Sequence, residues 1–471
     1  MLDSLLNIFG AKKTDYPVSE IMDRARRGRK AIYPFSNEKF RFSIYGASMF
    51  GDAKRFKTID DVVIAPPQFT PHRLEKAIEL ISREPIHHDV DTSTTIGGFS
   101  TKFPLVQSSM GSQDDWNKVA IYSAKACAKL GLIYGIGENI TATWGYKERN
   151  AANQPSFFER AINYLENVKD GLGGLVVQQN EEDAYDELWN KMYSDKRLDE
   201  YLQQGLIAFE IKGGQGAKAG MGGEKIVDRA TAKRLKQKYT MFPDPDEIEA
   251  EYYERHSSPD IFTEEILERR IKKLHNDYPN AKVWFKTGPY RDLEKVIEIA
   301  SRAGADNITV DGKEGGTGMS PGVALNDLGM PTLACIKAIR RAKEKKDAKT
   351  SIIVSGRLYN GAHIVKAMAL GANGIAMGRP FLLSAYAYPF ADHFIEHELY
   401  NNRVMRFIST DIIHPDERSV GFVRNFVDSV EIESKLLTAA VGKYKMRDLS
   451  TEDVEAHDPT IAESLNIKSV L

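Results

Sequence analysis

The chain has 471 residues, of which 42% are hydrophobic and 28% charged, a globular composition with room for one large domain plus extensions. Its 64 Lys and Arg nearly balance 66 Asp and Glu, and the net charge of −2 gives no overall field that favours nucleic acid or an anionic membrane. Two cysteines, Cys127 and Cys335, exclude a disulfide scaffold, a four-cysteine zinc site and an iron–sulfur cluster held only by this chain's thiolates.

The first hundred residues are mixed in composition and predict an N-terminal extension over 1–100. Residues 1–13 hold only a short apolar stretch, well below the roughly 20 residues that span a bilayer, and lack the pattern of a signal peptide. We therefore expect a cytoplasmic protein. The basic run from Arg24 to Lys30 is expected to be a solvated helix end, and no matching ligands surround His87 and His88, so no metal site is expected.

From Phe103 onward, short apolar runs alternate with longer segments of helical spacing, which is the pattern of βα units. Eight runs are predicted as strands: 104–107, 132–136, 175–178, 206–211, 283–286, 307–310, 351–354 and 374–377. A doubly wound sheet could be built from the same units, but the fingerprint G-x-G-x-x-G after an early strand is missing. We therefore predict an α/β protein with a (β/α)8 TIM barrel at 101–398.

Two further segments complete the predicted organisation. A long insertion after the fourth strand, at about 213–282, is expected on the rim that carries active sites in barrels. The C-terminal tail, 399–471, has short amphipathic stretches and is expected to pack against the outside of the barrel.

Glycines end the last two predicted strands, in Ser355-Gly356-Arg357 and in Gly378-Arg379-Pro380. In barrels these two loops commonly bind phosphate, because glycine lets backbone N–H groups approach the oxygens. Ordinary strand-to-helix turns are the alternative. The two arginines would add positive charge to a phosphate site.

The segment 351–382 resembles the closing part of FMN-binding barrels. Further motifs, in the same order along the chain, are similar to those of the FMN domain of glutamate synthase: 108–112 (SSMGS), 135–139 (GIGEN), 209–223 (FEIKGGQGAKAGMGG) and 311–321 (DGKEGGTGMSP). The resemblance runs from about 104 to 383 and implies an FMN-dependent oxidoreductase of amino-acid biosynthesis.

The glycine-rich turn after the fourth strand carries Lys212, Gln215 and Lys218. Two ammonium groups there could hold a dicarboxylate such as 2-oxoglutarate, whereas ordinary surface lysines are the alternative. The resemblance implies that Glu138 lies near the substrate nitrogen. These four residues are the candidate catalytic set.

Lys286 is the one charge of an apolar strand, and burying an unpaired ammonium is costly. A flavin would be a partner, because its reduced form is negative near N1 and O2, and a structural salt bridge is the alternative. The resemblance places Lys286 against the flavin and residues 108–110 along its ring. The candidate FMN-binding residues are Ser108, Ser109, Met110, Lys286, Gly315, Gly316, Ser355, Gly356, Arg357, Gly378 and Arg379.

The implied reaction is hydride transfer from reduced FMN to a 2-imino acid, formed from a 2-oxo acid and ammonia or an amine. Met221 replaces an acidic residue of the family, and Glu224 stands where the family usually has a glutamine that contacts the oxo acid. The identity of the oxo acid therefore stays open. Glutaminase activity is not expected, because Leu2 follows Met1, and segment 381–398 has no cysteine for the family's iron–sulfur cluster.

Several alternatives remain at this point. One is a non-catalytic FMN-binding redox subunit of a larger complex. Others are a type 2 isopentenyl diphosphate isomerase, a flavin-free phosphate-binding barrel, and a 2-hydroxy-acid oxidase, which is disfavoured because 311–316 lacks the histidine base. Expected partners are the small-molecule substrates, a separate glutaminase or electron-donor protein, and further copies of the chain in a homo-oligomer.

Overall fold

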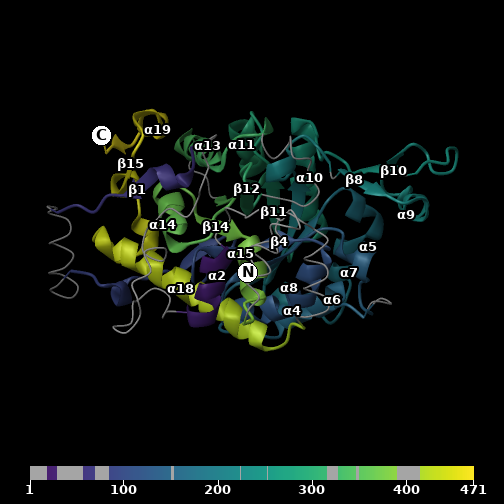
Figure 1. Ribbon diagram of the computed structural model, residues 1–471, viewed down its shortest axis with the longest axis horizontal. Helices are drawn as coiled ribbons and strands as arrows, with labels where there is room; N and C mark the ends of the chain where they lie inside the picture. Colours follow the sequence, from purple (N-terminus) through teal and green to yellow (C-terminus); the bar gives the residue numbers. More distant parts are fainter. Residues whose placement is uncertain are drawn as a thin grey trace, which may run out of the picture.

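The computed structural model describes residues 18–28, 57–68, 84–149, 153–222, 224–251, 253–315, 327–345, 350–389 and 414–470. Its centre is a closed barrel of eight parallel strands (Figure 1). In chain order they are β4 (Leu105–Met110), β5 (Ile133–Ile136), β6 (Gly174–Gln179), β7 (Ile207–Gly213), β11 (Lys282–Thr287), β12 (Asn307–Asp311), β13 (Ser351–Ser355) and β14 (Gly374–Met377). Strand β14 pairs with β4 and closes the ring. The eight predicted strands and the (β/α)8 fold are confirmed.

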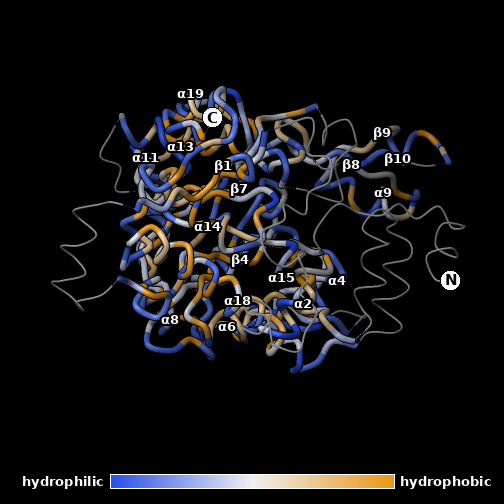
Figure 2. Tube along the Cα trace, turned by 60° about the vertical axis from the view of Figure 1, so that its left-hand side comes forward, coloured by the Kyte–Doolittle hydropathy of each residue, from blue (hydrophilic) through white to orange (hydrophobic). Residues whose placement is uncertain are grey.

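Helices cover the outside of the barrel. The main ones are α4 (Asp114–Lys129), α6 (Phe157–Leu165), α10 (Glu264–Asp277), α11 (Leu293–Ala303), α13 (Thr332–Lys345) and α14 (Gly361–Ala369). Helix α10 shows how the sequence encodes them: Leu267, Ile271 and Leu274 are buried at helical spacing, and the Thr263 hydroxyl accepts from the N–H of Ile266 at the N-terminus. Hydrophobic residues accordingly gather inside and hydrophilic ones outside (Figure 2).

A hairpin closes the end of the barrel where the strands begin. It consists of β2 (Thr94–Ile96) and β3 (Phe99–Thr101). Ile96 and Phe99 pack with the first interior residues of the strands in one apolar cluster, and Trp284 Nε1 donates to the carbonyl oxygen of Gly97 at 3.1 Å. Because this end is filled by apolar side chains, polar chemistry is confined to the opposite rim, where the strands end.

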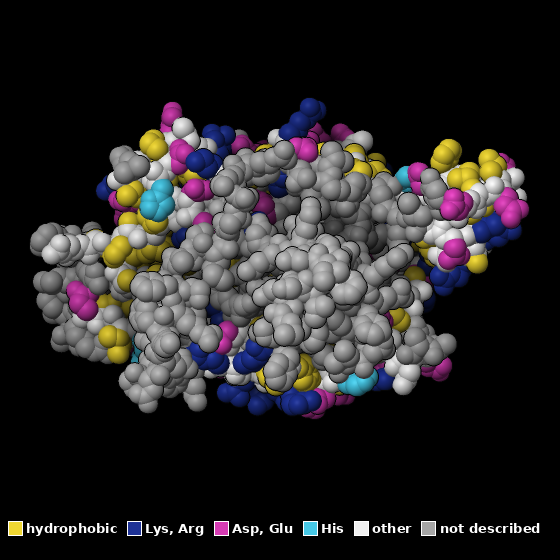
Figure 3. Space-filling model, in the orientation of Figure 1, with side chains coloured by type: hydrophobic (Ala, Val, Ile, Leu, Met, Phe, Trp, Pro, Cys, Tyr) yellow, Lys and Arg dark blue, Asp and Glu magenta, His cyan; other side chains and the backbone are white. Residues whose placement is uncertain are grey.

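The segment between β7 and β11 forms an arm that projects from the barrel, on the right of Figure 1. Its antiparallel sheet has the order β8-β10-β9 and consists of β8 (Glu224–Val227), β9 (Thr240–Phe242) and β10 (Tyr253–His256). Helix α9 (Arg229–Leu235) lies between β8 and β9 along the chain. Hydrophobic side chains lie among charged ones on this arm (Figure 3), and Phe242 is 66% exposed. Helix α10, which follows, packs on the barrel itself.

The described N-terminal helix, α2 (Val18–Arg27), lies beside α18 (Arg418–Ala440) near the other end of the chain (Figure 1). Arg24 is 2% exposed and forms a 2.6 Å ion pair with Glu433. Arg26 donates to the carbonyl oxygens of Ala387 and Tyr388, at 3.1 and 2.8 Å. The expectation of a solvated basic helix end is therefore wrong for Arg24 and Arg26, because α18 and the turn after α15 (Arg379–Ala385) supply distant partners. Arg29 and Lys30 lie outside the described residues.

The C-terminal region also joins the N-terminal one in a small sheet. Strand β15 (Val454–Ala456) pairs with β1 (Val62–Ile64) and with β16 (Lys468–Ser469). Helix α18 is 23 residues long and packs across α2, α4, α14 and α15 (Arg379–Ala385). Among the helices the structure describes, none combines the length and apolar character needed to cross a membrane.

Candidate active site

A largely buried ion pair lies at the rim where β5 and β7 end. Lys212, inward-facing near the end of β7, donates to Glu138 Oε1 just after β5, and the side chains of Lys212 and Glu138 are 3% and 18% exposed. Burial alone would raise the pKa of Glu138, but Lys212 and Lys218 outweigh it and lower that pKa to about 2. Glu138 is therefore a carboxylate at neutral pH, and both lysines face it.

The turn after β7 carries the other two candidate catalytic residues. Gln215 ends the extended segment and Lys218 closes the single turn η5 (Gly216–Lys218). The backbone of this turn is bound to the loop after β12: Gly216 N donates to Asp311 Oδ2 at 3.0 Å, and Ala217 N to Gly315 O at 3.0 Å. The structure thus gathers Glu138, Lys212 and Lys218, and places Gln215 on the same turn.

Asp311, at the end of β12, connects three parts of the rim. Besides the Gly216 N–H, it accepts from Ser355 Oγ at 2.5 Å and forms an ion pair with Lys286 Nζ at 3.8 Å. Asp311 is 5% exposed and Lys286 is 8% exposed. The salt bridge that was the alternative for Lys286 is therefore present, and it leaves Lys286 at the barrel mouth.

The end of β4 presents a surface suited to a flat ring. Ser108, Ser109 and Met110 are each partly exposed at the mouth. A Cβ built on Gly378 would lie 3.5 Å from Met110 Sδ, so the loop after β14 adjoins this strand. The Ser109 hydroxyl points into the barrel, where it donates to Glu210 Oε2 at 3.1 Å.

The loop after β13 has an unusual backbone. Arg357 has a φ of 56°, a left-handed conformation that is rare outside glycine, and Gly356 has a φ of 128°. Such backbone strain gathers at ligand-binding turns. Arg379 is exposed at the start of α15. Gly315 lies beside Asp311, whereas Gly316 falls outside the described residues.

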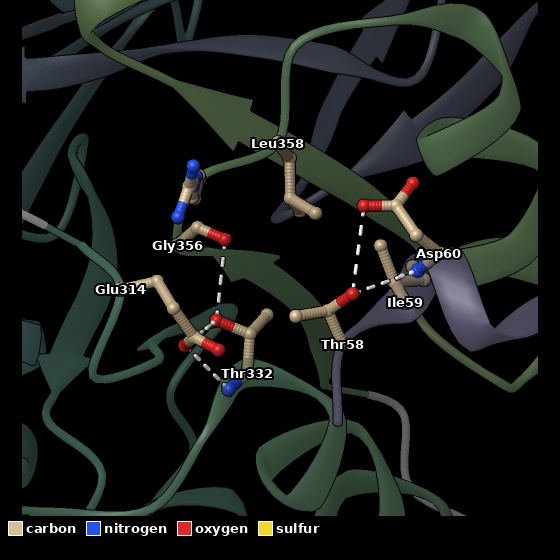
Figure 4. Close-up of a pocket in the computed structure, with 8 residues that line it drawn as sticks. Thr58, Ile59, Asp60, Glu314, Thr332, Gly356 and Leu358 are labelled. Carbon is tan, nitrogen blue, oxygen red and sulfur yellow. Dashed lines mark hydrogen bonds between the residues drawn. The ribbon is translucent and has the colours of Figure 1, made fainter. Parts of the chain in front are cut away.

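A pocket lies beside the Gly356-Arg357 loop (Figure 4). At its centre, Thr332 donates from its N–H and hydroxyl to Glu314 Oε2, at 2.7 and 2.6 Å, and its hydroxyl lies 3.2 Å from the carbonyl oxygen of Gly356. Arg357 lines the pocket together with two acidic residues, Asp60 and Glu314, so positive and negative groups both border it. The Thr332 hydroxyl supports the Gly356-Arg357 loop.

Three residues near the candidate set were not predicted. Asp183 accepts from the N–H of Asn139 with both oxygens, at 3.0 Å each, and so holds the turn that carries Glu138. The Tyr290 hydroxyl lies 3.5 Å from Gly220 N over the turn after β7. Glu210 is buried inside the barrel. Asp183 lies in a short 3-10 helix, η4 (Glu182–Asp186), and Tyr290 in the loop after β11, and neither segment has a motif. Only the inward register of Glu210 could have indicated its position.

Asp183 makes the stability depend on pH. Burial raises its pKa to about 7, and the nearby Glu138 carboxylate adds to the rise. Since the folded protein then holds a proton that the unfolded chain releases, this contribution to stability falls as pH rises from about 4 to 7. The free energy of unfolding, measured in urea, should therefore fall less between pH 4 and pH 7 in Asp183→Asn than in the wild type, by on the order of 2–4 kcal/mol. Equal slopes in both proteins would contradict this assignment.

Comparison with known proteins agrees with the sequence motifs. Residues 162–387 match the family described as the conserved region in glutamate synthase. A glutamate synthase large subunit-like protein of Rhizobium meliloti (strain 1021) is 35% identical over 187 residues, which cover 38% of this chain and 39% of that protein. The archaeal glutamate synthase [NADPH] of Archaeoglobus fulgidus is 32% identical over 194 residues, or 39% of this chain and 35% of that protein. The chain thus spans less than two fifths of the length of either relative.

The resemblance to glutamate synthase that was inferred from the sequence is confirmed for the motifs in the later part of the barrel. Those after β7, β12, β13 and β14 lie inside the matched residues, whereas those around Ser108 and Glu138 precede them. Solved structures share the fold. A flavocytochrome b2 mutant with pyruvate bound has a TM-score of 0.50 and 14% identity over 88% of this chain and 79% of that one. An oxidized active mutant of (S)-mandelate dehydrogenase has a TM-score of 0.50 and 14% identity over 93% of this chain and 99% of that one.

Proposed function

Because residues 162–387 carry the conserved region of glutamate synthase, we propose that this chain is an FMN-dependent oxidoreductase of the glutamate synthase type. Its reaction would convert a 2-imino acid, formed from a 2-oxo acid and ammonia or an amine, into a 2-amino acid. The observation that carries the proposal is the buried pair of Lys212 and Glu138, with Lys218 facing the same carboxylate. Paired opposite charges at one rim suit a substrate that has a carboxylate beside a nitrogen.

The described residues fit FMN. Ser108, Ser109 and Met110 would cover the ring, and Lys286 would face its negative side. The backbone of Gly356 and Arg357, with the loop at Gly378 and Arg379, would hold the phosphate. When bound, FMN would supply the hydride from its N5 atom.

Lys212 is the group best placed to bind the acid. Its ammonium donates to Glu138, and an ammonium, with three N–H donors in all, suits a carboxylate or 2-oxo oxygen. Lys218 and Gln215, on the bound turn after β7, would complete the contact. A second carboxylate on the substrate would have to rely on Lys218, because Lys212 already shares its charge with Glu138. The side chain of Glu224 lies outside the described part of the chain.

Glu138 would act as a carboxylate. With its pKa lowered to about 2 by the two lysines, it is a poor proton donor at neutral pH. It would instead attract the positive charge of an ammonium or iminium nitrogen, because the same low pKa also makes it a weak base. Lys212 would then be the donor nearest to the leaving oxygen, which departs as water.

The test is made in two steps on the purified full chain. FMN is added, and binding is followed by the flavin absorption and by quenching of its fluorescence. The bound flavin is then reduced artificially under anaerobic conditions. Reoxidation by 2-oxoglutarate or another 2-oxo acid together with ammonia, with a stoichiometric amount of amino acid, is the expected result.

Two outcomes would contradict the proposal in different ways. If no flavin binds, the chain is not an FMN enzyme. If flavin binds but no 2-oxo acid with ammonia or an amine reoxidises it, the chain is a redox subunit rather than a synthase. A 2-hydroxy acid that reduces the oxidised flavin would indicate an oxidase instead.

A further inference from the structure

A carboxylate lies inside the barrel below the candidate site. Glu210 sits in the middle of β7, two residues before Lys212, and is 2% exposed. Because both residues face inward, Glu210 lies one layer deeper than the Lys212–Glu138 pair. No step of the proposed reaction uses it, and a buried charge without a role is costly.

The hydrogen bonds of Glu210 join three other strands. It accepts from Ser109 Oγ at 3.1 Å, from Gln178 Nε2 at 2.6 Å and from Thr309 Oγ1 at 2.8 Å. These donors lie on β4, β6 and β12. Ser109 belongs to the surface proposed to cover the flavin, so Glu210 holds part of that surface from below.

Glu210 also faces Lys286. The paired residue of Glu210 on β11 is Trp284, and Lys286 follows two positions later on the same inner face. Burial raises the pKa of Glu210 above its ordinary value, and the charge of Lys286 is the largest of the influences that oppose this rise. The hydrogen bonds donated by Ser109, Gln178 and Thr309 also favour the ionised carboxylate. Lys286 has a second acid at 3.8 Å, Asp311. One ammonium at the mouth of the barrel is therefore opposed by two buried carboxylates.

We propose that Glu210 is a positioning residue that lowers the reduction potential of the bound flavin, by offsetting the charge of Lys286 and by fixing Ser109 beneath the ring. This inference rests on the proposed function, since it requires bound FMN. Reduced flavin is negative near N1 and O2, so a nearby positive charge stabilises it and a nearby negative charge disfavours it. A low potential makes the flavin a stronger hydride donor, which suits reduction of an imine.

The test compares the two-electron potentials of FMN bound to the wild-type chain and to Glu210→Gln. Glutamine keeps the size and can still accept hydrogen bonds, but it removes the charge. We expect the variant to bind reduced FMN about tenfold more tightly relative to oxidised FMN, a rise of about 30 mV. Thr309→Val is the matched control: it removes one hydrogen bond to Glu210 and no charge, so the potential should stay near that of the wild type.

Lys286→Met should shift the potential in the opposite direction. In the double variant Glu210→Gln/Lys286→Met both side chains are neutral, so neither leaves the other as an uncompensated buried charge. Its potential can therefore be measured even if the single Glu210 variant folds poorly. Its potential should be higher than that of Lys286→Met alone. Equal potentials in those two proteins, or an unchanged potential in folded Glu210→Gln, would overturn the inference. A wild-type chain that binds no FMN would instead refute the proposed function, and this inference with it.

Discussion

Lys212→Met is expected to lower kcat/KM for the 2-oxo acid by about 10² to 10³-fold while FMN stays bound. The ammonium of Lys212 is buried and hydrogen-bonded to Glu138, so it is held in place before substrate arrives. Methionine keeps the apolar stem and removes only the charged donor. Because the flavin would lie against other residues, the measurement is the rate of flavin reoxidation at increasing oxo-acid concentration, with flavin absorption as the check on binding.

A matched substitution and a double variant separate the role of Lys212 from general damage. Lys218→Met removes the second lysine that faces Glu138, but Lys218 is partly exposed, so a smaller loss of about tenfold is expected. Lys212→Met also leaves Glu138 without its main partner, at a cost to stability of about 3 kcal/mol. Adding Glu138→Gln should recover most of that stability but not the activity. Near-normal turnover in folded, FMN-bound Lys212→Met would show that the pair is structural.

The barrel and part of the site follow from the sequence because they depend on local patterns. Each apolar run is short, is followed by a helical segment, and ends in a polar or glycine-rich turn. This pattern predicts a strand of a parallel sheet. Parallel strands all end at one rim, and this brings Glu138 on one strand end close to Lys212 on another. The choice of Glu138 itself follows from the resemblance to the FMN domain of glutamate synthase, not from the strand pattern.

The remaining polar network depends on which residues meet across the interior. The sequence predicts only that Glu210 is an inward-facing residue of a strand. Its three hydrogen-bond donors lie on strands far apart in the sequence, which no local pattern indicates. Asp183 lies in an acidic run that looks like a surface loop, yet it is buried against the backbone of Asn139. Arg24 was wrongly expected to be solvated because its carboxylate partner, Glu433, lies 409 residues away in the sequence.

The projecting arm shows a contact that no sequence pattern indicates. The Tyr239 hydroxyl donates to Asn139 Oδ1 at 3.1 Å, and Lys238 forms a 2.6 Å ion pair with Asp186. Asn139 follows Glu138 directly, and Asp186 lies in the 3-10 helix that contains Asp183. The arm is therefore bound to the segments that carry Glu138 and Asp183. These contacts join residues far apart in the sequence, so no local pattern could predict them.

Gly216→Ala should damage the substrate turn while leaving FMN binding intact. A Cβ at this position would overlap the carbonyl oxygen of Gly312, a backbone atom that cannot rotate away. The turn would have to move, and its bonds from Gly216 N to Asp311 and from Ala217 N to Gly315 O would weaken. We expect a loss of about 2 kcal/mol in unfolding free energy and of about 10²-fold in kcat/KM, because small displacements of binding groups are costly.

Gly220→Ala is the control for this prediction, because it lies on the same turn and has a different constraint. Gly220 has a φ of 73°, but nothing lies within 4 Å of an added Cβ, so alanine brings backbone strain of about 1 kcal/mol and no overlap. Its activity should stay within a few-fold of the wild type. Both variants are measured in two ways. Urea unfolding reports the loss of stability from backbone strain, and flavin reoxidation kinetics report the loss of activity from displacement of the turn. If the two variants lose activity equally, close approach at Gly216 is not what positions Lys212, Gln215 and Lys218 for the acid.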